Sequence, residues 1–170
     1  PRIHANQLSR TTAVALAIEL GAASADHLSA SSDADIEALA ASTTVATLLP
    51  GAEFSTQHEG KLGRRFLDAH AQVAIATDCN PGSSFTTSMP FCIAAAVSLL
   101  GFTVEEAVHA ATSGGAAALR RSDIGNLAIG SRADIAILKS PSYIHLAYRP
   151  GAALVETTLK AGRKVKTWQK

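Results

Sequence analysis

Short apolar segments and amphipathic segments follow one another in a regular order along the first 120 residues. Segments typical of strands lie at 2–5, 24–29, 44–51 and 72–78, and most of the stretches between them have the apolar spacing of a helix. These β-then-α units recur at intervals of roughly twenty to thirty residues. Such a rhythm predicts a parallel sheet with helices packed outside it.

Boundary signals refine this pattern. The pair Pro50-Gly51 is expected to end the third strand. Thr103 with Glu106 three residues later forms the signature of a capping box at the start of a helix over 104–120. Within that helix we expect Gly114-Gly115 to cause a break or a bend.

After residue 121 the pattern changes. The segments 124–138 and 153–168 alternate apolar with polar residues and contain glycine turns. This alternation predicts short antiparallel strands in a small β element. We therefore expect two domains, an α/β part at 1–121 and a β part at 122–170.

Charge and composition exclude several classes of function. The 15 basic and 14 acidic residues give a net charge of +1, which leaves no basic stripe for nucleic acid and no polybasic membrane anchor. No apolar run is long enough to span a bilayer. The two cysteines, Cys79 and Cys92, make neither a disulfide framework nor a cysteine-based zinc site, so we expect a cytoplasmic protein. The chain opens on Pro1 and almost at once on strand-like sequence, and we expect it to be part of a longer protein.

Three polar side chains fall at the ends of predicted strands. His4 closes the first strand, His27 the second and Asp78 the fourth. In parallel α/β folds the carboxyl ends of strands converge, and two imidazoles with a carboxylate form a mixed nitrogen and oxygen environment that suits Zn²⁺ or Fe²⁺. Such an ion would keep Asp78 ionised, and the second oxygen of Asp78 could take a proton from water. The alternative is structural: each histidine could be an ordinary hydrogen-bonded residue, and Asp78 could simply form a turn.

The segment Asn80-Pro81-Gly82-Ser83-Ser84 also has two interpretations. As structure, it is a turn that leads into the next helix. As function, backbone N–H groups of Gly82 and Ser83, a serine hydroxyl and the Asn80 amide could bind a ligand that carries a carboxylate.

Several of these segments together resemble the imidazolonepropionase family of the amidohydrolase superfamily. The matching pieces cover nearly the whole chain, in order: "IHANQLS", "ELGAASADHL", "VATLLPGA", "VAIATDCNPGSS", "EEAVHAAT", "IGSRADIAIL" and "VETTLKAGR". The resemblance implies the C-terminal half of a TIM-like (β/α)8 barrel of a metal-dependent hydrolase, with barrel strands five to eight in 1–121. It also implies that 122–170 supplies strands to a small composite β-sandwich.

The resemblance further implies an activity and a set of roles. The reaction is hydrolysis of the cyclic amide C–N bond of 4-imidazolone-5-propanoate to N-formimidoyl-L-glutamate, in histidine degradation, with one divalent ion, zinc or iron. Carried over by position, His4 and Asp78 look like metal ligands, and Asp78 also moves the proton. The residue similar to the histidine that polarises the substrate carbonyl is His27. The positions similar to substrate-binding residues are Gln7, Asn80, Gly82 and Ser83.

Some positions depart from the family pattern. Gln7 cannot be a general base, Asn6 stands where the family often has Asp, and Ala153 stands where it usually has Asn. No His-x-His pair occurs in the sequence, although the superfamily places one on its first barrel strand. We therefore expect the chain alone to be inactive and to bind metal weakly.

The resemblance leaves the partners and the final activity open. The expected partner is the missing N-terminal half of the barrel, and a homodimer is a second arrangement to consider. Two alternative functions remain: another cyclic amidohydrolase or deaminase of the superfamily, and a non-catalytic half-barrel subunit.

Overall fold

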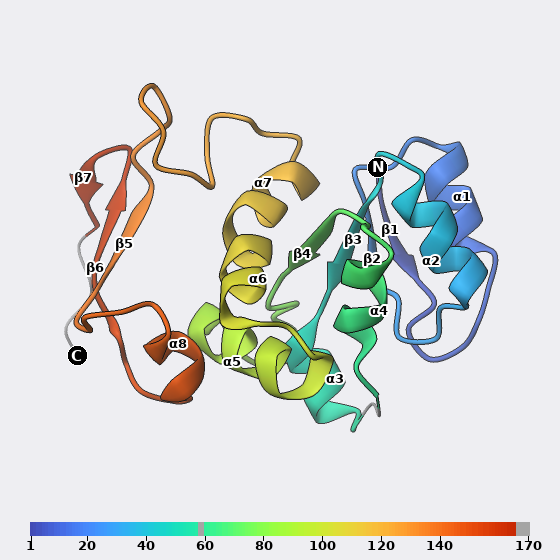
Figure 1. The fold of residues 1–170 in the computed structure, drawn as a ribbon, viewed down its shortest axis with the longest axis horizontal. Coiled ribbons are helices and arrows are strands. Elements are labelled where there is room, and N and C mark those ends of the chain that lie inside the picture. Colours follow the sequence, from blue (N-terminus) through green and yellow to red (C-terminus); the bar gives the residue numbers. More distant parts are fainter. Residues whose placement is uncertain (58–59, 166–170) are drawn as a thin grey trace.

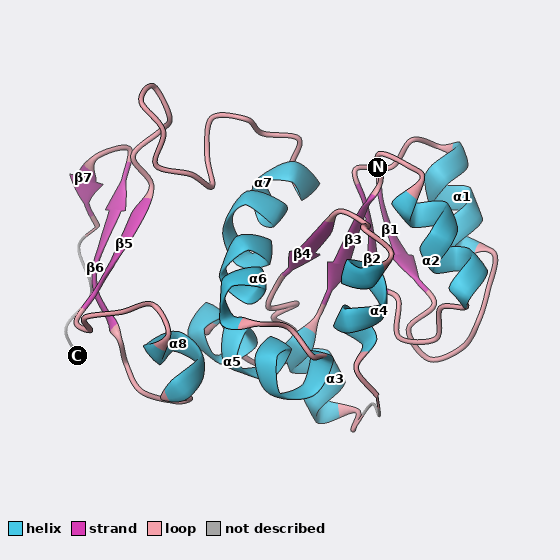
Figure 2. Cartoon of the chain, viewed as in Figure 1, coloured by secondary structure: helices cyan, strands magenta, loops and turns pink. Residues whose placement is uncertain are grey.

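The chain forms two sheets with a layer of helices between them (Figures 1 and 2). The computed structural model describes residues 1–57 and 60–165. The first part of the chain contains β1 (Arg2–Ala5), α1 (Ala13–Glu19), β2 (Ser24–His27), α2 (Asp33–Ala40), β3 (Val45–Leu48), α3 (Pro50–Ser55), α4 (Leu62–Asp68) and β4 (Val73–Ile75). The middle part contains α5 (Met89–Leu100), α6 (Val104–His109), the π-helical segment η1 (Ala110–Gly114) and α7 (Gly115–Ala118). The last part contains β5 (Ile135–Leu138), α8 (His145–Tyr148), β6 (Val155–Lys160) and β7 (Arg163–Lys164).

The first four strands form one parallel sheet in the order β1-β2-β3-β4. The register places Arg2 beside Ser24, Ser24 beside Val45, and Ala46 beside Val73. Each strand is three or four residues long. Because the four strands are parallel, all their carboxyl ends lie at the same edge of the sheet. The predicted parallel sheet of βα units is confirmed.

The core lies mainly between this sheet and its helices. Its largest fully buried side chains include Phe66 of α4, Leu39 of α2, Leu48 of β3 and Leu100 of α5. Many of the remaining core positions are alanines, whose small side chains let helix and strand backbones approach closely.

The helical run after α5 begins and breaks where the sequence predicts. Thr103 caps α6 through the Glu106 backbone N–H, and the Glu106 carboxylate accepts a hydrogen bond from the Thr103 backbone N–H at 2.8 Å. The break at Gly114-Gly115 takes the form of η1, which packs on β4. Gly114 permits this approach, because a Cβ there would lie 2.2 Å from the Val73 carbonyl oxygen.

Two helices and the ends of the third and fourth strands differ from the predictions. The third strand stops at Leu48, and Pro50 starts α3 instead of merely ending the strand. Proline suits the first helical turn because the N–H it lacks would have no partner there. The short helix α8, which was not predicted, lies between the two segments expected to form strands. The fourth strand ends at Ile75, three residues before Asp78.

Strands β5, β6 and β7 form a separate antiparallel sheet, as predicted for the last part of the chain. Between this sheet and the first one, α8 packs against α5. Leu146 and Leu154 belong to the same buried cluster as the helices of the first part, so the division at residue 121 stays a prediction. Among the described residues, no helix has the length and apolar character needed to cross a membrane.

Candidate active site

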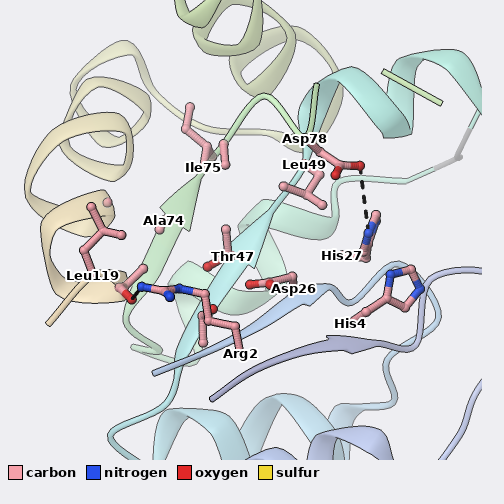
Figure 3. A pocket seen from close by; sticks show the side chains of 14 residues that line it. Arg2, His4, Asp26, His27, Thr47, Leu49, Ala74, Ile75, Asp78 and Leu119 are labelled. Carbon is pink, nitrogen blue, oxygen red and sulfur yellow. Dashed lines mark hydrogen bonds and ion pairs between the residues drawn. The ribbon is translucent and has the colours of Figure 1, made fainter. Parts of the chain in front are cut away.

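A cavity of about 480 Å³ runs along one face of the parallel sheet and reaches the carboxyl ends of its strands (Figure 3). His4, His27 and Asp78 all line it. The ring centroids of His4 and His27 lie 4.3 Å apart with the rings tilted by 52°. The distance from His27 Nε2 to Asp78 Oδ2 is 3.9 Å. The sheet therefore gathers three side chains that are far apart in the sequence.

Burial and neighbouring charges act on the His27 imidazole. The residue is 5% exposed, and Nδ1 is buried without a hydrogen-bond partner among the described residues. Burial, and then the nearby His4, lower the pKa of His27 from its ordinary value of 6.5, while Asp78 and Asp26 act in the opposite direction. A neutral imidazole can bind a metal ion or donate one hydrogen bond, and His27 could have either role in this site.

The backbone is left-handed at several positions around this cavity. Asn6, His27, Leu28 and Asp78 have φ angles of 47°, 76°, 68° and 47°. Each such non-glycine residue costs on the order of 1–3 kcal/mol and persists only where its surroundings hold it. These residues lie at or just beyond the ends of β1, β2 and β4, and they are four of the eight described non-glycine residues with a positive φ.

The loop after Asp78 is organised by the Asn80 side chain. Its amide nitrogen donates to the Asp78 backbone oxygen at 2.7 Å and to Asp78 Oδ2 at 3.1 Å. Its amide oxygen accepts from the backbone N–H groups of Gly82 at 2.8 Å and Ser83 at 2.9 Å. In this arrangement the loop holds Asp78, and a ligand would have to compete with Asn80 for both N–H groups. The substrate-binding role of Asn80, Gly82 and Ser83 stays a prediction.

Gln7 lines a smaller neighbouring hollow of about 220 Å³, which shares His4 with the first cavity. The preceding residue, Asn6, accepts hydrogen bonds from the backbone and hydroxyl of Thr11 at 3.0 and 2.7 Å. Its amide nitrogen donates to Asp35 Oδ2 at 3.4 Å. Asn6 therefore shapes the loop that carries Gln7, and the binding role of Gln7 stays a prediction.

The side chains at the cavity are of the types that bind metal ions, but the described residues bring too few of them together. Imidazole nitrogen and carboxylate oxygen are the ligands that zinc and iron accept, and the buried Nδ1 of His27 has no partner in the described part of the chain. Within residues 1–57 and 60–165, however, no group of three or more His, Cys, Asp or Glu side chains is gathered closely enough to hold an ion. The described residues thus fit part of a coordination sphere.

The floor of the cavity contains polar residues that the sequence reasoning did not single out. The Arg2 guanidinium donates to the Ala118 backbone oxygen at 3.1 Å, and Asp26 lies nearby in the same cavity (Figure 3). The hydroxyls of Ser24 and Thr47 are buried there without a partner among the described residues. Counting back two residues along the strand from His4 would have found Arg2, because alternate residues share one face of a strand.

Solved structures with the same fold include metal enzymes. An adenosine deaminase from Xanthomonas campestris with bound zinc matches 96% of this chain and 44% of its own, with a TM-score of 0.80 and 20% identity. An atrazine chlorohydrolase from Arthrobacter aurescens, also complexed with zinc, matches 96% of this chain and 43% of its own, with a TM-score of 0.77 and 16% identity. At these identities the likeness establishes the fold alone.

Curated relatives are much closer in sequence. An imidazolonepropionase of Mycolicibacterium smegmatis is 62% identical over 169 residues, and one of Streptomyces avermitilis is 61% identical over 166 residues. These matches cover 99% and 98% of this chain but only 42% and 40% of the relatives, so the chain spans about two fifths of their length. The pattern of the amidohydrolase family matches residues 5–165, and the protein therefore belongs to that family.

Proposed function

We propose that this chain carries the C-terminal portion of the active site of an imidazolonepropionase. The complete enzyme would hydrolyse the cyclic amide of 4-imidazolone-5-propanoate to N-formimidoyl-L-glutamate. The observation that carries the proposal is the meeting of His4, His27 and Asp78 in one cavity, in a chain 61% identical to a curated imidazolonepropionase. Two free cysteines, exposed Cys79 and buried Cys92, support a cytoplasmic setting.

The proposed roles follow from the chemistry of the side chains. His4 and Asp78 would hold one divalent ion, zinc or iron, together with ligands from the rest of the protein. When bound, the ion would supply a Lewis acid and lower the pKa of water in the site. Asp78 would accept a proton from the attacking water and deliver it to the ring nitrogen that leaves, so that water adds across the C–N bond. His27, neutral and buried, would donate a hydrogen bond to the oxygen of the scissile carbonyl.

Substrate binding would involve the two loops beside the cavity. Gln7 lies in the loop after β1, and Asn80, Gly82 and Ser83 lie in the loop after β4. Through the hydrogen bonds from Asn80 to Asp78, the second loop would also fix the carboxylate that moves the proton. The remaining contacts to the propanoate group would come from the N-terminal half of the barrel.

Complementation tests this proposal. The 170-residue chain is incubated with 4-imidazolone-5-propanoate alone and after co-expression with the N-terminal portion of the M. smegmatis relative. Product is measured by mass spectrometry. We expect no turnover by the chain alone and turnover by the complemented pair. Asp78→Asn should reduce that turnover by on the order of 10²–10⁴, the usual contribution of a general acid–base group.

Matched variants separate the proposal from its alternatives. Cys79→Ser changes the exposed neighbour of Asp78 and should leave turnover intact. Unchanged turnover in Asp78→Asn would remove that carboxylate from the mechanism. A complemented pair that binds zinc and hydrolyses or deaminates a different ring would favour another activity of the family, and a pair that binds none would favour a non-catalytic subunit.

A further inference from the structure

The turn that carries His27 has an unusual backbone. His27 and Leu28 are consecutive residues with φ angles of 76° and 68°, and neither is a glycine. Leu28 is fully buried, so the turn cannot relax by moving its side chain into water. Two adjacent left-handed residues persist only where the surrounding structure determines them. The direction of the His27 imidazole therefore depends on whatever holds this turn.

The first side of the turn is held by the end of β1. The Leu28 backbone N–H donates to the Ala5 oxygen at 2.9 Å, and the Ala30 backbone N–H donates to the Asn6 oxygen at 2.7 Å. These bonds continue the β1–β2 ladder beyond the last paired residues of β2. They leave the opposite side of the turn, toward β3 and α3, to be held by other groups.

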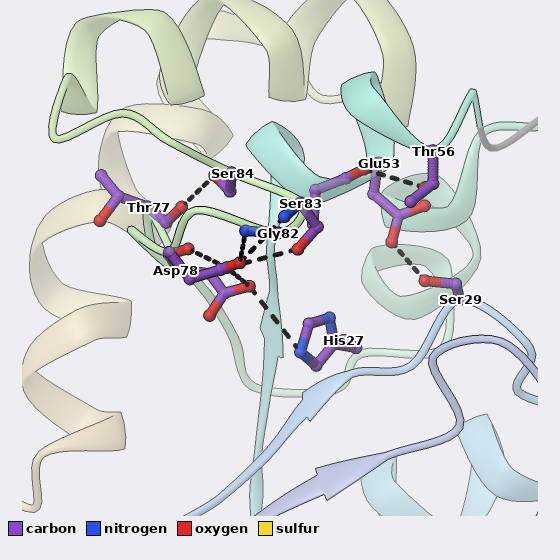
Figure 4. Close-up of polar contacts among 11 residues, drawn as sticks. His27, Ser29, Glu53, Thr56, Thr77, Asp78, Gly82, Ser83 and Ser84 are labelled. Atoms are coloured by element: carbon purple, nitrogen blue, oxygen red, sulfur yellow. Dashed lines mark hydrogen bonds and ion pairs between the residues drawn. The ribbon is translucent and has the colours of Figure 1, made fainter.

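Glu53 holds that opposite side. It lies in α3, directly after β3, and only 3% of the residue is exposed. The Ser29 hydroxyl donates a hydrogen bond to Glu53 Oε1, which links the residue after the left-handed pair to the neighbouring βα unit (Figure 4). Burial of a carboxylate is costly unless hydrogen bonds compensate for it, so an apolar residue would be the cheaper choice for packing alone.

We propose that Glu53 is a positioning residue for His27. By accepting a hydrogen bond from the Ser29 hydroxyl, Glu53 holds the 27–28 turn on the side of α3. The end of β1 holds the same turn on its opposite side. The His27 ring is thereby kept within reach of Asp78 and His4. The catalytic consequence rests on the role proposed for His27, but the positioning itself is a property of this chain and is measured without substrate or metal.

Nuclear magnetic resonance of the His27 ring, together with amide hydrogen exchange, tests the proposal in the full 170-residue chain. Ser29→Ala removes the donor and Glu53→Leu removes the acceptor. Both should shift the His27 ring signals and speed exchange of the Leu28 and Ala30 amides by about tenfold, as expected when the partner of a buried hydrogen bond is removed. Glu53→Gln keeps an oxygen at the acceptor position and should restore much of the unsubstituted spectrum.

Thr56→Val is the matched control. It removes the hydroxyl of the residue that caps α3, which donates a hydrogen bond within that helix, to the Ala52 oxygen at 2.9 Å. Its His27 signals should stay in place. Unchanged ring signals in Ser29→Ala would overturn the proposal, even if Glu53→Leu fails to fold. Equal changes in Thr56→Val would also overturn it, because they would reflect general loosening of α3. Positioning could hold even if complementation showed that His27 takes no part in hydrolysis, so the two failures are distinguishable.

Discussion

Replacement of Gly114 by alanine would place a methyl group against the backbone of β4. The added Cβ would lie 2.2 Å from the Val73 carbonyl oxygen and 3.2 Å from the Ala74 Cα, and real Cβ contacts essentially never fall below 3.0 Å. Neither atom belongs to a side chain that could rotate away. Either η1 must move off the sheet or β4 must shift, and β4 leads directly to Asp78.

The magnitude follows from two opposing effects. Overpacking in a well-packed core costs about 1–3 kcal/mol, and a clash with backbone belongs at the upper end of that range, about 3 kcal/mol. Alanine is favoured over glycine in a helix by about 1 kcal/mol, which offsets part of the cost. The net loss in the free energy of unfolding is about 2 kcal/mol. For a protein of this size each kcal/mol corresponds to about 2–4 °C, so the Tm should fall by about 4–8 °C.

Gly115→Ala provides the control in the neighbouring residue. A Cβ at Gly115 would meet only the Ala110 carbonyl oxygen at 3.9 Å, which is an ordinary contact. This variant should keep the helix-propensity gain and raise the Tm by about 2–4 °C. Thermal unfolding followed by far-ultraviolet circular dichroism measures both. Equal midpoints for the two variants would refute the argument that the close approach of η1 to β4 requires Gly114.

Three further predictions concern other parts of the chain. Burial raises the pKa of the Cys92 thiol to about 11, so iodoacetamide at pH 8 should label exposed Cys79 and spare Cys92, and equal labelling by mass spectrometry would contradict this. Hydrogen bonds from Arg64 hold the pKa of Glu106 below its ordinary value of 4.5, so the stability that Glu106 contributes is present above pH 4.5 and is lost as the pH falls through the lower folded-state pKa. Glu106→Gln should therefore be less stable than the unsubstituted chain at pH 7 and equally stable well below pH 4.5, and a urea-unfolding difference that is independent of pH would contradict this. Phe66→Ala removes a fully buried ring and should cost about 3–5 kcal/mol in the same assay, whereas a loss under about 1 kcal/mol would show that the core repacks.

The parallel sheet was predictable because the hydrophobic pattern of each βα unit is contained within a short stretch of sequence. Helix α3 was missed for the opposite reason, since Pro50-Gly51 can either stop a strand or begin a helix. Packing of this segment against α5 decides between the two, and Gly51, Ala52 and Glu53 are all buried. Helix α8 has only four residues, and its formation depends on Leu146 packing against distant α5. Such non-local contacts leave little trace in the hydrophobic pattern.

The candidate site was predictable as a place but not as a set of contacts. A parallel sheet brings His4 and His27 to one edge because each stands at the end of a strand, whereas Asp78 reaches that edge through the loop that follows β4. The left-handed backbone at His27 and Asp78 could not be read from their residue types, because neither is a glycine. The amide of Asn80 could equally have faced a ligand, and only the folded loop turns it toward Asp78.

These contacts bear on how the site would be completed. The chain already fixes His27 through the Leu28–Ala5 and Ser29–Glu53 hydrogen bonds, and it fixes Asp78 through Asn80. Both side chains are therefore oriented by groups of this chain before any other segment contributes. Under the proposed function, the rest of the protein would supply further metal ligands, because the described residues gather no group of three or more candidate ligands. A completing segment would then raise metal affinity by adding donors to a preorganised half-site, and little of its binding energy would be spent on reorienting His27 or Asp78.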